Sequence, residues 1–417
     1  MKRLFAILLM LSTLSVAASA QWYLYPGNKN KQKEQFEQTE KKASENPATK
    51  PAEKPAEQIA EQTIQLPAEP DTLLAAADSS FILDIPETIN VTLLLPLKSS
   101  AKPSLNFYEY YTGAMLAASD LGRSGLKVNL NVYDTESSSA TAAALEASDV
   151  IIGPVSASAI KAMLPKLPES KYIVSPLEPK ATAYADSSRV IQAPSSWESQ
   201  MNELVRWVGE EKRFTDRVIV VTEEDETKLG PNARYLLAKI RESGIDHTIS
   251  RTSTVNDIQL GKTTRFIVAS DDDKYLCTAV NNIGNLALRN PGIILYAQSK
   301  LRNNDAIHSE SLYRANARLA ANYYVDYTSD EVKDFIMRFR AALGSEPSSF
   351  GFHGYDTVHY FVSLVATYGR NWYQKLPEYS ESGLQADFKF EETETVGNVN
   401  KAVRRVIYNP DLSARLQ

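Results

Sequence analysis

Short runs of apolar, β-forming residues alternate with longer segments of helical spacing from Ile89 onward. Strand patterns occupy residues 89–96, 126–134, 149–154, 171–176 and 189–194, and helical patterns occupy 105–121, 137–148 and 156–167. Parallel strands that follow each other need a crossover connection, which is usually a helix and almost always right-handed. The alternation therefore predicts a parallel sheet with helices on both faces.

A second series of the same kind follows Ser195. Its patterns are a helix at 196–212, a strand at 217–223, a helix at 232–243, a short strand near His247, a strand at 265–270, a helix at 272–284 and a strand at 292–297. The chain then predicts a strand at 319–327, helices at 330–343 and 355–368, and an antiparallel tail from Gly383 to Tyr408. The expected fold class is α/β, with two doubly wound parallel-sheet lobes in tandem.

The first 87 residues have other patterns. A basic pair at 2–3 precedes an apolar run at 4–16 that is too short to span a bilayer, and the residues ASA at 18–20 fit a secretory cleavage site. Residues 1–20 are therefore predicted to be a signal peptide. The only cysteine is Cys277, so a lipoprotein anchor is not expected and a periplasmic location is. Residues 21–87, interrupted by prolines and rich in Glu, Lys, Gln and Ala, indicate a disordered linker or tail.

Charge and motif content disfavour several function classes. The chain has 45 basic and 51 acidic residues and a formal net charge of −6, so it lacks the basic surface that nucleic-acid binding requires. It contains no G-x-S-x-G elbow, no H-E-x-x-H and no Walker loop, and its four histidines do not have metal-ligand spacing. We therefore expect no enzymatic activity, no cofactor, no metal and no membrane span in the mature chain.

The stretch DVIIGPVSASAIKAML at 149–164 places a Gly-Pro break between a strand pattern and a helical pattern. Ligands of open parallel sheets bind beyond the carboxyl ends of the strands, where helix N-termini direct free N–H groups outward. The N–H groups of Ser156, Ala157 and Ser158 are thus candidates for holding an anion or a carbonyl. The alternative is that Ser156 caps its own helix, because serine is a preferred N-cap. Both can hold together.

Five segments carry a family resemblance: VTLLLPL, FYEYYTGAMLAASDL, VIIGPVSASA, YIVSPLEPKAT and, late in the chain, VKDFIMRFRAALGSEPSSFGFHGYDTVHYFVSL. Together they resemble the type I periplasmic binding proteins over residues 89–408, in particular the branched-chain amino-acid receptors and the penicillin-binding-protein activators. The resemblance implies two lobes, joined by a hinge of three crossing strands, that close over a ligand in the cleft between them. It implies lobe one at 88–194 and 319–384, and lobe two at 195–318 and 385–417.

Residue by residue, the resemblance implies cleft contacts at Ser156, Ala157, Ser158, Leu177, Asp271, Tyr296 and Gln298. Three of these depart from the pattern of the amino-acid receptors. Ala157 stands where those receptors usually have a serine, and Leu177 begins a segment that lacks their ligand-binding hydroxyl. Gln298 stands where they tend to present an acid to the ligand's ammonium. Burying an ammonium without a counter-charge is costly, so a plain amino acid is disfavoured as the ligand.

Acidic residues follow two strands of the second series, at Glu223–Asp225 and Asp271–Asp273. One interpretation is that they cap helices and face solvent, as carboxylates near helix N-termini commonly do. The other is that they form an acidic cleft wall, extended by Glu178 of lobe one. Such a wall would select a cationic or metal-bearing ligand.

Two non-enzymatic functions remain open at this point. In the first, the chain is a solute receptor that binds a small polar ligand and delivers it to an ABC transporter or a sensor. In the second, it is a ligand-free protein-interaction module that regulates cell-envelope (peptidoglycan) synthesis, as the activators do, with a cell-wall synthase as partner. Compaction or a melting shift on adding a small molecule would separate the two.

Overall fold

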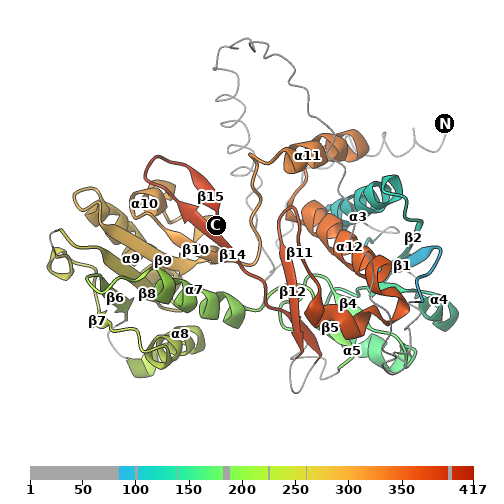
Figure 1. Cartoon of the computed structure of the whole chain (residues 1–417), viewed down its shortest axis with the longest axis horizontal. Coiled ribbons are helices and arrows are strands. Elements are labelled where there is room, and N and C mark those ends of the chain that lie inside the picture. Colours follow the sequence, from blue (N-terminus) through green and yellow to red (C-terminus); the bar gives the residue numbers. More distant parts are fainter. Residues whose placement is uncertain are drawn as a thin grey trace, which may run out of the picture.

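The computed structural model describes residues 84–98, 102–137, 139–181, 188–223, 226–259, 261–392 and 397–417. These residues form two lobes, each built around its own sheet (Figure 1). The predicted signal peptide (1–20) and nearly all of the predicted linker (21–87) lie outside the described residues. Within the described residues, no helix has the length and apolar character that crossing a membrane requires.

The sheet of lobe one has eight strands within the described residues, in the order β11-β12-β13-β5-β4-β3-β1-β2. They are β1 (Ile89–Leu95), β2 (Val128–Asp134), β3 (Val150–Ile152), β4 (Ile173–Ser175), β5 (Val190–Gln192), β11 (Ser380–Ser382), β12 (Asp387–Glu392) and β13 (Asn398–Asn400). Strands β1 to β5 pair in parallel, and the two pairs that β12 makes are antiparallel.

The sheet of lobe two has the order β15-β14-β10-β9-β8-β6-β7. Its strands are β6 (Arg217–Thr222), β7 (Thr248–Ser250), β8 (Thr264–Ala269), β9 (Ile293–Gln298), β10 (Arg318–Ala321), β14 (Arg404–Tyr408) and β15 (Ala414–Leu416). Strands β6 to β10 pair in parallel, and β14 pairs antiparallel to both of its neighbours. The predicted fold class is confirmed, with the addition that antiparallel strands complete one edge of each sheet.

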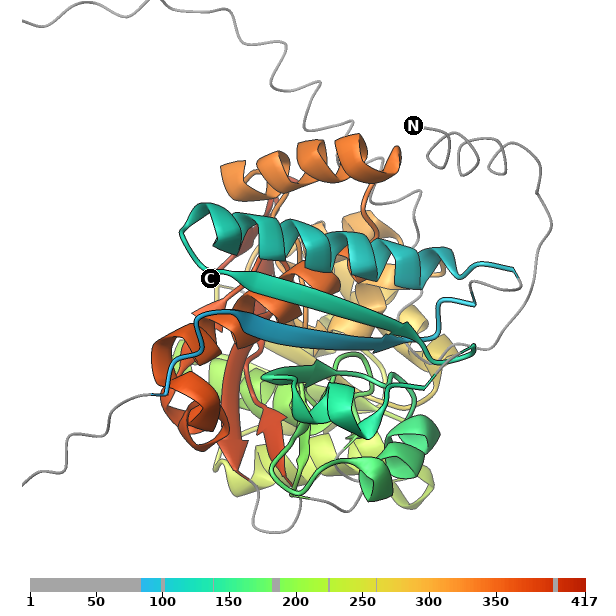
Figure 2. The ribbon, with the colours of Figure 1, turned by 90° about the vertical axis from the view of Figure 1, so that its right-hand side faces the viewer.

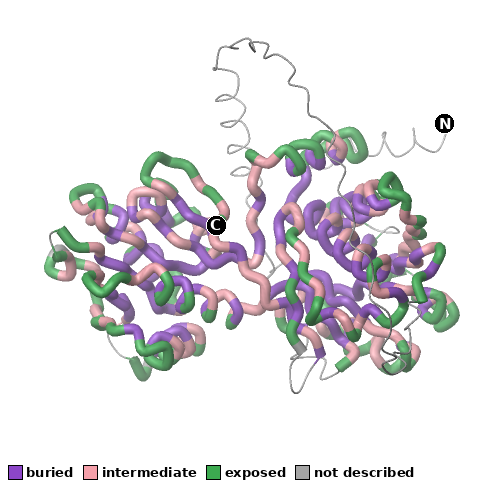
Figure 3. Tube along the Cα trace, in the orientation of Figure 1, coloured by how far each residue is buried: buried purple, intermediate pink, exposed green. Residues whose placement is uncertain are grey.

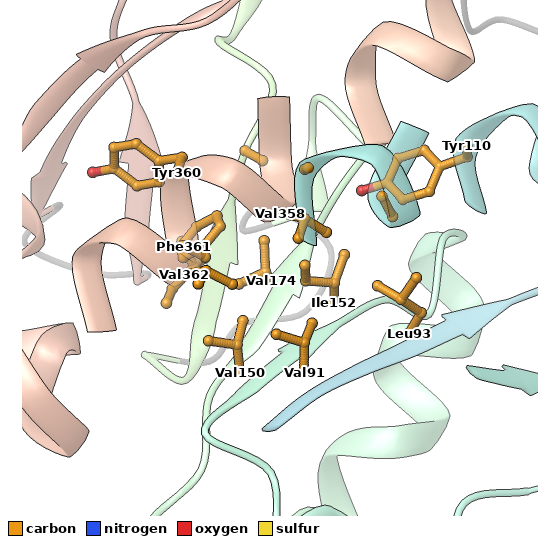
Figure 4. Packing of buried hydrophobic residues seen from close by; sticks show 14 of the residues in the cluster. Val91, Leu93, Tyr110, Val150, Ile152, Val174, Val358, Tyr360, Phe361 and Val362 are labelled. Atoms are coloured by element: carbon orange, nitrogen blue, oxygen red, sulfur yellow. The ribbon is translucent and has the colours of Figure 1, made fainter. Parts of the chain in front are cut away.

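Each sheet buries both of its faces, because successive side chains of a strand point to opposite sides. In lobe one, Leu93 contributes to the core under α3 (Leu105–Arg123) and α12 (Ser349–Tyr368), as Figure 4 shows. Its neighbour Leu94 packs on the other side, with residues near α4 (Ala142–Glu146) and α5 (Ala157–Met163). Helix α11 (Asp330–Leu343) lies against α3 on the outer side (Figure 2).

Lobe two is covered in the same way. Ile219 faces α9 (Asp273–Ala287) and α10 (Ser309–Arg314), and Val220 faces α7 (Trp197–Glu211) and α8 (Pro231–Glu242). Short 3₁₀ segments complete the chain: η1 (Leu164–Lys166), η2 (Glu226–Lys228), η3 (Val255–Asp257), η4 (Ser299–Asn303) and η5 (Gly369–Glu378). Figure 3 shows the buried strands running through the centre of each lobe.

The chain crosses between the sheets three times, between β5 and β6, between β10 and β11, and between β13 and β14. Sheet membership places β10 in lobe two and β12 and β13 in lobe one. These strands lie on the other side of the limits expected at 319 and 385, because a strand pattern does not say which sheet the strand joins. The three crossings are the connections about which the lobes can move.

The Gly-Pro break after β3 has a packing reason. Gly153 has a φ of +95°, and a Cβ at this position would lie 2.2 Å from the carbonyl oxygen of Leu94 in β1. Only glycine fits both the backbone angle and the close approach. The stop in the sequence pattern is therefore needed to end β3 beside β1.

Candidate functional site

An open pocket of ≈ 590 Å³ lies between the lobes, where residues that follow β4 and β5 meet residues that follow β9 and β10. Lobe one contributes Pro179, after β4, and Ser195, after β5. We call this site the interlobe pocket. Its remaining lining residues, Trp197, Gln200, Asp273, Gln298, Ser299, Lys300, Leu301, Arg302, Asn303, Asn304, Asp305, Asn322 and Tyr323, come from lobe two and the crossings.

Two polar atoms at this pocket lack a hydrogen-bond partner within the described residues. They are Oγ of Ser195, a residue that is 1% exposed, and Nε1 of Trp197, which can only donate. The hydroxyls of Ser175, which ends β4, and Thr222, which ends β6, are unpartnered in the same way. A buried polar group without a partner costs about 1–3 kcal/mol. Such groups call for an explanation, and an absent ligand is one.

The start of α7 is held in place by local hydrogen bonds. Ser196 caps the helix, accepting at Oγ from the N–H of Ser199 at 3.1 Å. One turn in, Oε1 of Gln200 accepts from the hydroxyl of Ser299 at 3.1 Å, which joins α7 to η4. The ring of Trp197 packs edge-on against Tyr235, with centroids 5.3 Å apart. The polar atoms of the first turn thus have fixed positions at the pocket.

The charged residues of the interlobe pocket interact with neighbouring groups. Nζ of Lys300 lies 3.3 Å from Oδ1 of Asp273. Arg302 donates to the carbonyl of Tyr323 at 2.9 Å, and its guanidinium lies 4.6 Å from the centre of that ring. Asp305 is likewise engaged. The pocket therefore combines paired charges with uncharged amide, hydroxyl and indole groups.

The predicted lobe-one residues have local roles. Ser156 caps α5, accepting at Oγ from the N–H of Ala159 at 3.3 Å, and lies 3.2 Å from the hydroxyl of Ser158. Ala157 is the first residue of α5, and Leu177 is buried in the core under α3 and α12. None of these four borders the interlobe pocket.

Of the predicted lobe-two residues, Gln298 lines the interlobe pocket and is 5% exposed. Tyr296 is fully buried within the lobe, where it donates to Oε2 of Glu211 at 2.6 Å and accepts from Arg265. Oδ2 of Asp271 accepts from the N–H groups of Asn232 and Ala233, at 3.0 and 3.1 Å, at the start of α8. Its carboxylate therefore serves that helix.

The other acidic residues of this edge also have local partners. Asp272 caps α9, Asp273 pairs with Lys300, and Glu223 accepts from the hydroxyl of Ser270. Glu224 and Asp225 lie outside the described residues. Within the described residues, no group of three or more His, Cys, Asp or Glu side chains is placed to hold a metal ion. These contacts favour the helix-capping interpretation over the acidic cleft wall.

Sequence reasoning missed Ser195, Trp197 and Asn322, which border the pocket at two of the crossings. Ser195 and Asn322 follow β5 and β10 closely, so the rule that ligands bind beyond strand ends could have found them. The prediction applied that rule to the strands where the resemblance supplied contacts, and passed over the crossings.

A second pocket, of ≈ 540 Å³, lies between α11, α12 and the β11–β12 hairpin on one side and β14 and β15 on the other. Here Nδ1 of His359 lies 2.6 Å from Oε1 of Glu381, which also accepts from the hydroxyl of Tyr379 at 2.6 Å. The hydrogen bond to Glu381 raises the pKa of His359, and burial opposes that rise. The pair joins α12 to β11.

This pair predicts a pH dependence of stability. A histidine whose pKa is higher in the folded state than its unfolded value of about 6.5 stabilises the fold below that value. The contribution is lost as pH rises through the folded pKa. We therefore expect the urea midpoint to fall from pH 6 to pH 9, and to fall less in a His359→Gln variant. His308→Gln, at an exposed position, is the control and should keep the full decrease. An unchanged slope in His359→Gln would contradict the assignment.

The comparisons with known proteins agree with this architecture. A putative branched-chain amino acid ABC transporter protein from Rhodospirillum rubrum is 14% identical, covers 79% of this chain and 100% of its own, and has a TM-score of 0.53. LivJ from Streptococcus pneumoniae, solved with isoleucine, is 16% identical (79% and 99% covered, TM-score 0.39). The LpoA C-domain from Haemophilus influenzae, a regulator of PBP1A, is 13% identical (79% and 99% covered, TM-score 0.47).

At these identities a structural match is evidence for fold and not for function. The first match, with the higher TM-score, supports the assignment, and the chain has the fold of the type I periplasmic binding proteins. No family model matches the sequence. A search of curated proteins also found no match.

Proposed function

We propose that this chain is a non-catalytic, extracytoplasmic solute-binding protein that closes its two lobes over a small polar ligand in the interlobe pocket. The observation that carries the proposal is the pair of unpartnered atoms, Ser195 Oγ and Trp197 Nε1, at a pocket lined by both lobes. A pocket of ≈ 590 Å³ is within the range of about 300–1,000 Å³ in which proteins bind small molecules.

A hinge motion brings the ligand to these atoms. Both atoms are buried beneath the pocket wall in the present arrangement, so a ligand oxygen reaches them when the lobes rotate about the crossings. Ser195 and Trp197 lie at the first crossing, between β5 and α7. A small rotation there changes the exposure of both side chains, and ligand binding then satisfies groups that are unpaired without it.

This role predicts opposite effects of one substitution on stability and on binding. Ser195→Ala removes an unpaired buried hydroxyl, so it should stabilise the ligand-free protein by about 1 kcal/mol and weaken ligand binding. The buried Ser148, whose hydroxyl bonds to Thr92 and to the carbonyl of Ala144, is the matched control. Ser148→Ala should destabilise by about 1 kcal/mol. Urea unfolding measures both. A Ser195→Ala variant less stable than the wild type would contradict the role.

The ligand itself is sought by native mass spectrometry of the full chain, purified under mild conditions from its own periplasm. We expect a small molecule in one-to-one ratio, whose removal by partial unfolding and refolding increases the radius of gyration in small-angle X-ray scattering. A chain that carries no small molecule and whose radius of gyration is unchanged by this treatment would argue against the proposal.

The alternative is a ligand-free protein-interaction module of the cell envelope. It is favoured by one observation: two predicted contacts are used inside the fold, Ser156 to cap α5 and Asp271 to hold the start of α8. The same purification separates the two functions. A stoichiometric cell-wall protein that co-purifies with the chain, in place of a small molecule, would support the module.

A further inference from the structure

We infer that the ligand of the interlobe pocket is an uncharged polyhydroxylated compound of the sugar class, an inference that rests on the proposed function. Charge pairing, the types of polar group at the pocket and the one aromatic surface at the start of α7 lead to it. Each is a property of the described residues.

The charges at the pocket balance and are engaged. Two basic residues, Lys300 and Arg302, and two acidic residues, Asp273 and Asp305, line it. Lys300 pairs with Asp273, Arg302 is held by Tyr323, and Asp305 is engaged as well. A ligand ammonium or carboxylate would therefore have to break an existing contact or stay unpaired in a site that closes. Both are costly, so the pocket selects against a charged ligand.

The uncharged groups need a partner that both donates and accepts. The indole N–H of Trp197 can only donate, so it requires an acceptor. The amides of Gln298 and Asn303 each carry a donor and an acceptor, and the hydroxyl of Ser195 is both. A hydroxyl is the neutral ligand group that satisfies all of these, and a compound with several hydroxyls does so at several positions.

The side chain of Trp197 adds an apolar surface. It is partly exposed at the pocket, and Tyr235 packs edge-on against its ring. The C–H faces of a sugar ring are apolar and its rim is polar. An aromatic ring surrounded by amide and hydroxyl groups offers both kinds of contact at once.

The test measures thermal unfolding of the full chain with maltose, glucose and N-acetylglucosamine, and with leucine, lysine and glutamate. We expect a neutral sugar to raise the melting temperature by roughly 2–4 °C or more, and the charged and zwitterionic compounds to leave it unchanged. Gln298→Ala should weaken the affinity for that sugar about three- to tenfold, the loss of one hydrogen bond. Gln374→Ala, at an exposed glutamine on η5, is the matched control and should bind as the wild type does.

The outcomes separate this inference from the function beneath it. Stabilisation by a charged or zwitterionic compound and not by the sugars, or a charged molecule that co-purifies, overturns the ligand class and keeps the lobe-closing function. No stabilisation by any compound, together with no co-purifying molecule, overturns both. Equal sugar affinity of Gln298→Ala and the wild type removes the ligand from this pocket and so overturns the inference.

Discussion

Replacement of Gly354 by alanine is expected to disrupt the packing of lobe one. A Cβ at this position on α12 would lie 1.9 Å from the carbonyl oxygen of Tyr110 on α3. The reciprocal contact is as close, because a Cβ at Gly113 would lie 1.9 Å from the carbonyl oxygen of Gly351. These are backbone atoms of two helices, so no side chain can rotate away and the helices must separate. They cover the largest core of the lobe (Figure 4).

We expect Gly354→Ala to cost at least about 3 kcal/mol, the upper end of the usual overpacking range, and to lower the melting temperature by roughly 6–12 °C. Gly122 of α3 is the matched control, because nothing lies within 4 Å of a Cβ placed there. Gly122→Ala should be neutral or stabilise by up to about 1 kcal/mol, since alanine favours the helix. Differential scanning calorimetry compares them. Equal melting temperatures of the two variants would show that the helices are not in close backbone contact.

The same glycines explain where the sequence misled. The helical pattern predicted a helix starting at Tyr355, but α12 starts at Ser349, because Gly351 and Gly354 are poor helix formers and were assigned to a loop. Tertiary contact with α3 outweighs that propensity. Strands β1, β2, β6, β8 and β9 were predicted well, because each is a long apolar run.

The candidate site was less predictable from the sequence. Gln298 was found because it directly ends a strand, and strand ends can be read from the pattern. Ser195 and Trp197 depend on how the lobes sit relative to each other, which no periodicity encodes. Tyr296, two residues before Gln298, points into the lobe because it forms part of the α7 and α8 core. Chain position alone could not separate these two neighbours by role.

The turn between β11 and β12 is held from two sides by buried charges. Asp356 of α12 accepts from the N–H groups of Leu384, Gln385 and Ala386, at 2.7, 2.9 and 3.0 Å. Arg404, at the third crossing, donates to the carbonyl of Leu384 at 3.1 Å and to that of Tyr324, on the second crossing, at 2.6 Å. The turn thus links α12 to two of the connections between the lobes.

Removal of the Asp356 carboxylate should therefore affect both the stability of lobe one and the hinge. Asp356→Ala leaves three backbone N–H groups without acceptors, and each costs about 1–3 kcal/mol, so a loss of about 3 kcal/mol or more is expected. Asp356→Asn keeps one oxygen acceptor and should lose less, because only one N–H then faces an amide donor. Asp246→Ala, at an exposed position, should stay within about 0.5 kcal/mol of the wild type.

The pH dependence gives an independent check on this carboxylate. Burial raises the pKa of Asp356 to about 6, although the N–H donors and Arg404 oppose the rise. The folded state then binds a proton more readily than the unfolded state, whose value is about 3.9. Stability from this group falls as pH rises from about 4 to 6 and is constant above that range. Urea midpoints between pH 4 and 7 should show this decrease in the wild type and not in Asp356→Asn, which cannot titrate. A decrease of the same size in Asp356→Asn would mean that another group titrates there.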